Sequence, residues 1–124
     1  MNFSYSKDEK LKSRKTIEAL FTEGKSVGVY PLRLFYIELP ETEKSPFKTA
    51  VSVSKKNFKL AVHRNQIKRL LRETYRLNKA ILFENSAKKY ALLILYVGKE
   101  MPEFHSLNKT TKTAFEKFLQ QTKN

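Results

Sequence analysis

Residues 61–76 read AVHRNQIKRLLRETYR, a stretch in which hydrophobic and basic residues separate onto two sides of a helix. Hydrophobic residues recur every three or four positions, which is the spacing of an amphipathic α-helix. The pattern predicts a helix from about Val62 to Phe83 that packs on a hydrophobic core. The residues expected to face this core are Ile67, Leu70, Leu71, Thr74, Leu77 and Ile81.

The opposite side of the predicted helix is basic, and Glu73 is its only acid. Like charges four residues apart repel each other, and solvated helices usually alternate the sign of their charges. We therefore expect an external polyanion to contact this side, along a row on the order of 18 Å long at 1.5 Å per residue. Asn65 belongs to the row because an amide can both donate and accept hydrogen bonds. The predicted contact residues are Arg64, Asn65, Lys68, Arg69, Arg72 and Arg76.

The composition of the whole chain also favours a phosphate-bearing partner. Twenty-five Lys and Arg against twelve Asp and Glu give 124 residues a net charge of +13, which opposes folding through self-repulsion unless a polyanion relieves it. We expect no membrane contact, because the hydrophobic residues are needed for a core and the run at 91–97 is too short to cross a bilayer. The chain has no cysteine and no hydrophobic run at its start, so we expect a cytoplasmic protein without disulfides.

The segments before residue 61 alternate as strands. Val27 to Leu39, with Pro31 inside it, and Phe47 to Ser54 flank the turn-forming stretch PETEKSP at 40–46, which predicts an antiparallel hairpin. A first helix is expected between a capping Ser13 and a terminating Gly24. Residues 1–12 are polar and charged and predict a loosely ordered arm.

The segments after the basic helix complete an α+β domain. Residues 90–97, YALLILYV, form a continuous hydrophobic run, which predicts a central strand covered on both faces. Ser106 is expected to cap a last helix. We therefore predict one domain over residues 1–124, a two-layer sandwich with helices on a mostly antiparallel sheet, in the order α-β-β-β-α-β-α.

The sequence gathers no set of residues suited to metal binding or catalysis. His63 and His105 lie in different predicted elements, and the acids are scattered rather than paired. Ser52 and Ser54 have no base near them in sequence, and the glycines make no phosphate-binding loop. We therefore expect no protein active site and no cofactor bound by the protein alone, and interpret the chain as a binding protein.

A resemblance to a known family rests on residues 50–72, AVSVSKKNFKLAVHRNQIKRLLR. This run resembles the signature of the bacterial ribonuclease P protein subunit, in which a strand ending in SVSKK precedes the helix that carries the RNR motif. Here SVSKK spans residues 52–56, and Arg64 and Asn65 begin the motif. Gln66 stands where the family pattern has the second arginine. Residues 11–27 also resemble the first helix and glycine turn of the family.

This resemblance implies a four-stranded sheet with a left-handed βαβ crossover. It also implies an accessory subunit of the ribonucleoprotein endonuclease that removes the 5′ leader from precursor tRNA, in which the RNA subunit and its Mg²⁺ perform the hydrolysis. The basic helix side would then bind the RNA subunit. A cleft between the first helix and the sheet would bind the single-stranded leader, and its predicted residues are Phe21, either Phe35 or Tyr36, Ser52, Lys55 and Lys56.

The sequence leaves three other functions open. A structural RNA-binding protein of ribosomal type would use the same basic helix without stimulating precursor cleavage. A helix-turn-helix DNA-binding protein would need a short helix before residue 55, where the sequence alternates as a strand, so we expect no DNA partner. A protein-only nuclease would need acids that this sequence does not bring together.

Overall fold

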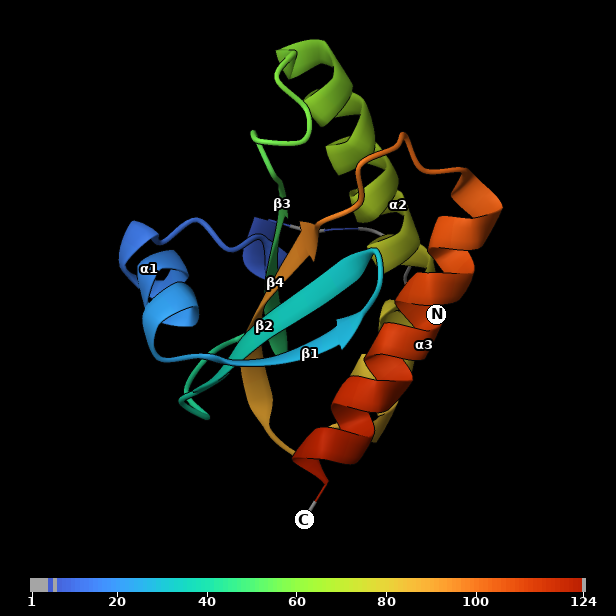
Figure 1. The fold of residues 1–124 in the computed structure, drawn as a ribbon. Coiled ribbons are helices and arrows are strands. Elements are labelled where there is room, and N and C mark those ends of the chain that lie inside the picture. Colours follow the sequence, from blue (N-terminus) through green and yellow to red (C-terminus); the bar gives the residue numbers. More distant parts are fainter. Residues whose placement is uncertain (1–4, 6, 124) are drawn as a thin grey trace.

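A computed structural model describes residue 5 and residues 7–123 of the chain (Figure 1). The elements along it are η1 (Lys7–Glu9), α1 (Arg14–Thr22), β1 (Lys25–Val29), β2 (Leu32–Leu39), β3 (Phe47–Val53), α2 (Ala61–Asn85), β4 (Lys89–Tyr96) and α3 (Phe104–Thr122). The four strands form one mixed sheet in the order β1-β2-β4-β3. The α+β class and the predicted order of elements are therefore confirmed.

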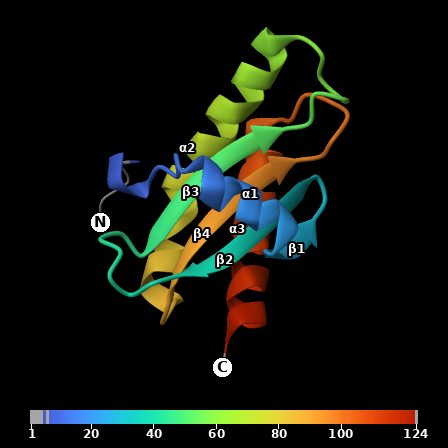
Figure 2. The same cartoon turned by 90° about the vertical axis from the view of Figure 1, so that its left-hand side faces the viewer.

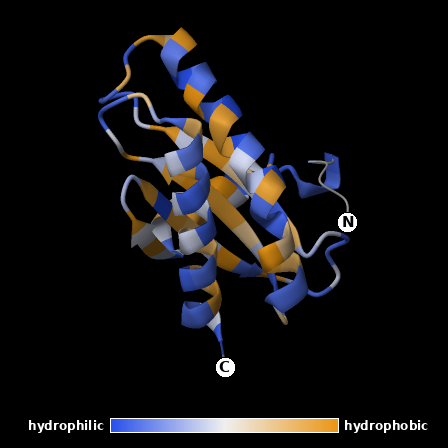
Figure 3. Ribbon diagram, turned by 90° about the vertical axis from the view of Figure 1, so that its right-hand side faces the viewer, coloured by the Kyte–Doolittle hydropathy of each residue, from blue (hydrophilic) through white to orange (hydrophobic). Residues whose placement is uncertain are grey.

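Helices cover both faces of the sheet. The long helices α2 and α3 lie on one face, and the short helix α1 lies on the other (Figures 1 and 2). The predicted two-layer arrangement thus gains α1 as a partial third layer. In Figure 3 the strands behind α2 and α3 are largely hydrophobic, while the colours alternate along both helices, as expected of amphipathic elements.

The predicted hairpin between residues 27–39 and 47–54 is wrong. β3 pairs in parallel with β4, and β4 lies between β3 and β2, so that Ile94 has Leu34 on one side and Val51 on the other. β4 is hydrophobic on both faces and buries the most surface in the middle of the sheet, whereas the small and polar residues of β3 suit an edge. The antiparallel hairpin is instead β1–β2, which turns at Tyr30 and Pro31.

Helix α2 begins and ends close to the predicted positions, but it is turned further toward α3 than expected. Ile67, Leu71 and Thr74 are buried as predicted, while Leu77 is 37% exposed. Tyr75, Asn78 and Lys79 are buried in addition. Hydrogen bonds to α3 explain this rotation of α2 about its axis. The Asn78 side-chain amide donates to Asn108 over 2.8 Å, and the Thr111 hydroxyl donates to Thr74 over 3.1 Å.

Residues 7–12 do not form the loosely ordered arm that we expected. The Leu11 amide donates to the carbonyl of Thr49 over 3.1 Å, so this segment covers part of the free edge of β3. Glu9 is only 5% exposed and pairs with Lys79 of α2. An open strand edge and a buried ion pair thus hold the segment in place. The remainder of the predicted arm, residues 1–4 and 6, lies outside the described residues.

The predicted helix ends are correct for α1 and wrong for α3. Ser13 caps α1 by accepting from the Thr16 amide over 3.2 Å, and a Cβ at Gly24 would collide with the carbonyl oxygen of Leu20. The N-cap of α3 lies three residues earlier than the predicted Ser106, and the helix begins at Phe104. Its cap is Glu103, which accepts from the amides of His105 and Ser106 over 3.1 and 2.8 Å.

Candidate nucleic-acid interface

The first turns of α2 project beyond the end of the sheet and carry the predicted basic row (Figures 1 and 2). Asn65, Arg69 and Arg72 are exposed, and Lys68 is half-buried. Lys68, Arg69 and Arg72 form no ion pair with any described residue. This part of α2 therefore presents uncompensated positive charge to solvent.

Two of the six predicted contact residues have partners within the protein. The Nη1 of Arg64 donates to the carbonyl oxygens of Phe58 and Lys59, both over 2.8 Å. Arg76 pairs with Glu73, one turn earlier on α2, and its Nε lies 3.3 Å from the carboxylate. We name the remaining set, Asn65, Lys68, Arg69 and Arg72, the α2 basic row.

An aromatic pair marks the boundary between α1 and the sheet. The rings of Phe21 on α1 and Phe35 on β2 lie 5.2 Å apart between centroids, tilted by 51°. Phe21 is 51% exposed, an unusual position for a phenylalanine. Together the two rings offer a hydrophobic surface that solvent can reach.

Helix α1 leaves the next part of the sheet face uncovered. Phe35 lies beside Leu93 in a row that packs against α1, whereas Arg33, Leu95 and Ser52 form the following row in register. Arg33 is exposed, and Leu95 and Ser52 are half-buried. Beyond β3, Lys55 and Lys56 are exposed in the loop to α2, so positive charge and the aromatic pair border one open area of the sheet.

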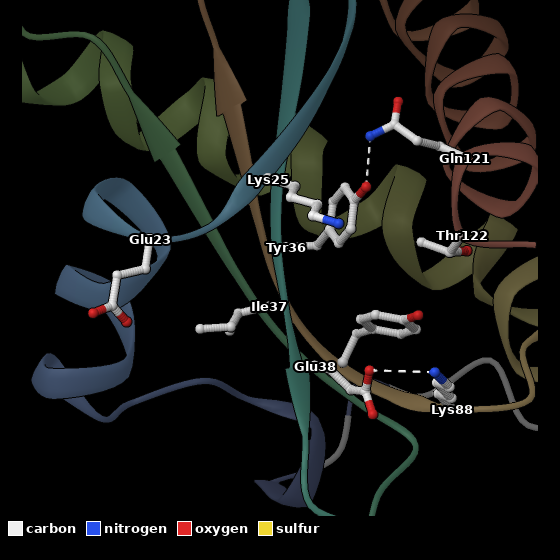
Figure 4. Close-up of a pocket in the computed structure, with 9 residues that line it drawn as sticks. Glu23, Lys25, Tyr36, Ile37, Glu38, Lys88, Gln121 and Thr122 are labelled. Atoms are coloured by element: carbon white, nitrogen blue, oxygen red, sulfur yellow. Dashed lines mark hydrogen bonds and ion pairs between the residues drawn. The ribbon is translucent and has the colours of Figure 1, made fainter.

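Of the two alternatives for the cleft, Phe35 borders this area and Tyr36 does not. Tyr36 is 5% exposed and faces α3, where its hydroxyl accepts from the side-chain amide of Gln121. Figure 4 shows Tyr36 directed toward α3 and Ile37 directed to the opposite side of β2, toward α1. Tyr36 instead borders a cavity of about 300 Å³ between β2 and α3.

The loop between β3 and α2 is held by bonds that the sequence did not indicate. The Asn57 amide donates to the carbonyls of Val97 and Gly98 over 3.2 and 3.3 Å. Phe58 is buried against Tyr96, with ring centroids 6.1 Å apart. With the bonds from Arg64, these contacts fix the backbone that carries the loop lysines. Contacts between residues about forty positions apart leave no periodic pattern in the sequence. The role of Asn57 in holding this loop is therefore visible only in the structure.

The histidines and acids bring no metal site together within the described part of the chain. Residue 5 and residues 7–123 contain no group of three or more His, Asp or Glu side chains placed to hold an ion. The same residues contain no helix long and hydrophobic enough to cross a bilayer.

Three comparisons relate this chain to known proteins. A family model described as Ribonuclease P matches residues 5–119. The ribonuclease P protein component of Porphyromonas gingivalis is 41% identical over 110 residues, which cover 86% of this chain and 80% of that protein. The protein of the same name from Chlorobium phaeobacteroides is 38% identical over 117 residues, covering 84% and 80%.

Solved structures show the same fold. The RNase P protein from Thermotoga maritima matches with a TM-score of 0.69 and 21% identity over 94% of this chain and 99% of that one. The RNase P protein from Staphylococcus aureus matches with a TM-score of 0.62 and 22% identity over 93% and 95%.

Proposed function

This chain belongs to the ribonuclease P protein family, and from that membership we propose how its two surfaces serve the enzyme. The chain is the protein component of a ribonucleoprotein that processes precursor tRNA. Its partners are the RNA subunit of ribonuclease P and the precursor tRNA substrate, and it works in the cytoplasm.

The α2 basic row binds the RNA subunit. Its side chains reach solvent without internal ion pairs, and a row of Lys and Arg gains affinity for phosphates by releasing counterions. Asn65 adds a donor and an acceptor between these charges for a sugar hydroxyl or base edge. Arg64 contributes by fixing the adjacent loop through its two backbone bonds.

The open area of the sheet beside α1 binds the 5′ leader of the precursor. The Phe21 and Phe35 rings stack on unpaired bases, and Lys55 and Lys56 pair with phosphates. Ser52 supplies a hydroxyl between them. Because stacking and phosphate pairing read little base identity, the protein accepts leaders of many sequences.

The protein assists catalysis by holding the two RNAs in position. The RNA subunit carries the Mg²⁺ that supplies the hydrolytic chemistry, and no side chain of this chain attacks phosphorus. Positioning of substrate against a catalytic core lowers the entropic part of the barrier. The single observation that carries this proposal is the α2 basic row, whose Lys and Arg side chains reach solvent without ion pairs to any described residue where α2 projects beyond the end of the sheet (Figure 1).

Reconstitution tests this proposal. The purified protein is mixed with its cognate RNA subunit at low Mg²⁺, and 5′ processing of a precursor tRNA is measured with and without protein. We expect processing to require or to be strongly increased by the protein. Cleavage by the protein without RNA, or RNA binding without any stimulation, contradicts the proposal, and the second result favours a structural RNA-binding protein.

A further inference from the structure

Three loops meet at one end of the sheet (Figure 2). They are the β1–β2 turn, the β3–α2 loop and the β4–α3 loop. The Val97 amide donates to the Pro31 carbonyl over 2.8 Å, and the Asn57 amide donates to the carbonyls of Val97 and Gly98. These bonds join the loops into one surface, which we name the loop platform and define as residues 30–31, 55–60 and 97–101.

The loop platform is closely packed underneath. A Cβ at Gly98 would lie 2.6 Å from the Tyr96 hydroxyl oxygen and 3.0 Å from the Cβ of Pro31, so only glycine fits between them. Phe58 is buried against the ring of Tyr96 below the loop lysines. A surface that is rigid before binding loses little entropy when a ligand docks.

The exposed side of the platform combines an aromatic ring with basic side chains. Tyr30 is 73% exposed, and its side chain forms no hydrogen bond or ring contact with any described residue. Met101, in the β4–α3 loop, is 43% exposed. The exposed lysines of the platform are Lys55, Lys56, Lys59 and Lys99. Rings among cations are the groups that hold unpaired nucleotides, through stacking and phosphate pairing.

The platform continues the open area of the sheet. Along β2, Phe35 lies beside α1, Arg33 lies in the uncovered row, and Pro31 belongs to the platform. At a strand rise of about 3.3 Å per residue, Phe35 and Pro31 are roughly 13 Å apart. A strand of RNA that leaves the Phe21 and Phe35 rings along the uncovered row therefore arrives at Tyr30.

We propose that the loop platform is a second subsite for the leader, in which Tyr30 stacks on a base beyond those held at Phe21 and Phe35. Lys59 and Lys99 pair with the phosphates on either side of that base. This inference rests on the proposed function of the chain in precursor processing. It lengthens the stretch of leader that the protein binds. It also gives a role to the Tyr30 ring, which is exposed and contributes nothing to the core.

Leader length provides the test. The holoenzyme is assembled from the RNA subunit and full-length protein, and its affinity is measured for precursor tRNAs whose leaders grow one nucleotide at a time. With wild-type protein we expect a second gain in affinity once the leader reaches the platform. The Tyr30→Ala protein lacks this gain and binds long-leader precursors roughly 5- to 150-fold more weakly, while short-leader precursors bind normally.

Two matched variants sharpen the test. Tyr30→Phe keeps the ring and should retain the second gain. Val62→Ala removes an equally accessible hydrophobic side chain outside the platform, since Val62 is 59% exposed, and should follow wild type at every length. The proposal is overturned if Tyr30→Ala follows wild type at every length, or if it loses affinity equally for mature tRNA.

The same series separates this inference from the proposed function. The Phe21→Ala and Phe35→Ala double variant should lose affinity for every precursor whose leader reaches the aromatic pair. If that variant is impaired and Tyr30→Ala is not, the platform alone is refuted. If the double variant binds every precursor like wild type, the leader part of the proposed function fails, and the platform inference fails with it.

Discussion

Lys79 and Glu9 form a buried ion pair that ties the segment before α1 to the second half of α2. The Nζ of Lys79 lies 2.9 and 3.0 Å from the two carboxylate oxygens, and the two side chains are 4% and 6% exposed. The Tyr75 hydroxyl donates to the same carboxylate over 3.3 Å. Burial raises the pKa of Tyr75, so its phenol stays protonated as a donor at neutral pH.

Removing one partner of this pair should destabilise the protein strongly. Glu9→Gln removes the carboxylate charge that pairs with the buried Lys79 ammonium, and we expect a loss of about 3–5 kcal/mol in the free energy of unfolding. Urea denaturation measures this loss, with the exposed Glu18→Gln as a control. The Glu9→Leu and Lys79→Met double variant should recover much of the stability. Equal, small effects of Glu9→Gln and Glu18→Gln would contradict a structural role for the pair.

Neutralising the α2 basic row should weaken binding of the RNA subunit and flatten its salt dependence. For Lys68→Ala with Arg69→Ala, the slope of log affinity against log salt should fall by roughly 0.7–0.9 per lost phosphate contact. Filter binding over a range of salt concentrations measures the slope. Lys109→Ala with Lys112→Ala removes the same charge from α3 and serves as the control. An unchanged slope for the α2 variant would remove these residues from the interface.

Substitution of Arg64 should lower the stability of the protein, whereas substitutions in the α2 basic row should lower its affinity for RNA. Arg64→Lys keeps the charge but lacks the Nη1 that donates to the carbonyls of both Phe58 and Lys59. We therefore expect a lower melting temperature, at about 0.5–1.5 kcal/mol per lost bond, with an unchanged salt slope. Arg69→Lys should change neither quantity. The expectation is wrong if Arg64→Lys melts like wild type and binds RNA with a reduced slope.

The aromatic pair should matter for the leader and not for the tRNA body. The Phe21→Ala and Phe35→Ala double variant should bind leader-bearing precursor more weakly by about 1–3 kcal/mol per lost stacked base, with mature tRNA binding unchanged. Tyr36→Phe is the matched control, because Tyr36 faces α3 and should leave precursor affinity intact. Equal losses for precursor and mature tRNA would argue against a leader site beside α1.

Helix α3 should carry a pH-dependent cap. Two backbone amides donate to Glu103 and lower the pKa of its carboxyl below the ordinary value of 4.5. The cap therefore stabilises the fold fully above pH 4.5, and the stabilisation is lost as the pH falls through the lower folded-state pKa. Glu103→Gln should melt below wild type at neutral pH, with a difference that shrinks in acid, while the exposed Glu116→Gln should match wild type throughout. A difference that is constant with pH would contradict this account.

The sequence predicted the elements well because their patterns are local. Helix α2, the strand at residues 90–97 and the Ser13 cap each depend on neighbouring residues. Pairing partners are not local. β2 and β3 are consecutive along the chain, yet each gains more by packing beside the hydrophobic β4 than beside the other, and the expected hairpin fails for that reason.

The sequence could not distinguish individual side chains where both alternatives have the same chemistry. Phe35 and Tyr36 are adjacent aromatic residues on a strand that is hydrophobic on both faces, so alternation could not say which one faces α1. Arg64 has the same side chain as Arg69 and Arg72, but its position at the helix start brings it to the loop carbonyls. The sequence did not indicate Tyr30 as a binding residue, because periodic patterns identify residues of helices and strands and Tyr30 lies in a turn.

The central strand is also the last strand in the chain. β2 and β3 share β4 as their neighbour, so the sheet cannot close until residue 96 of 124 has left the ribosome. Helix α2 is synthesised before that point, with no completed sheet to pack on. A nascent chain therefore carries its most basic segment while the domain is still incomplete, and only near the end of synthesis do α2 and the α1 side of the sheet take up their final arrangement.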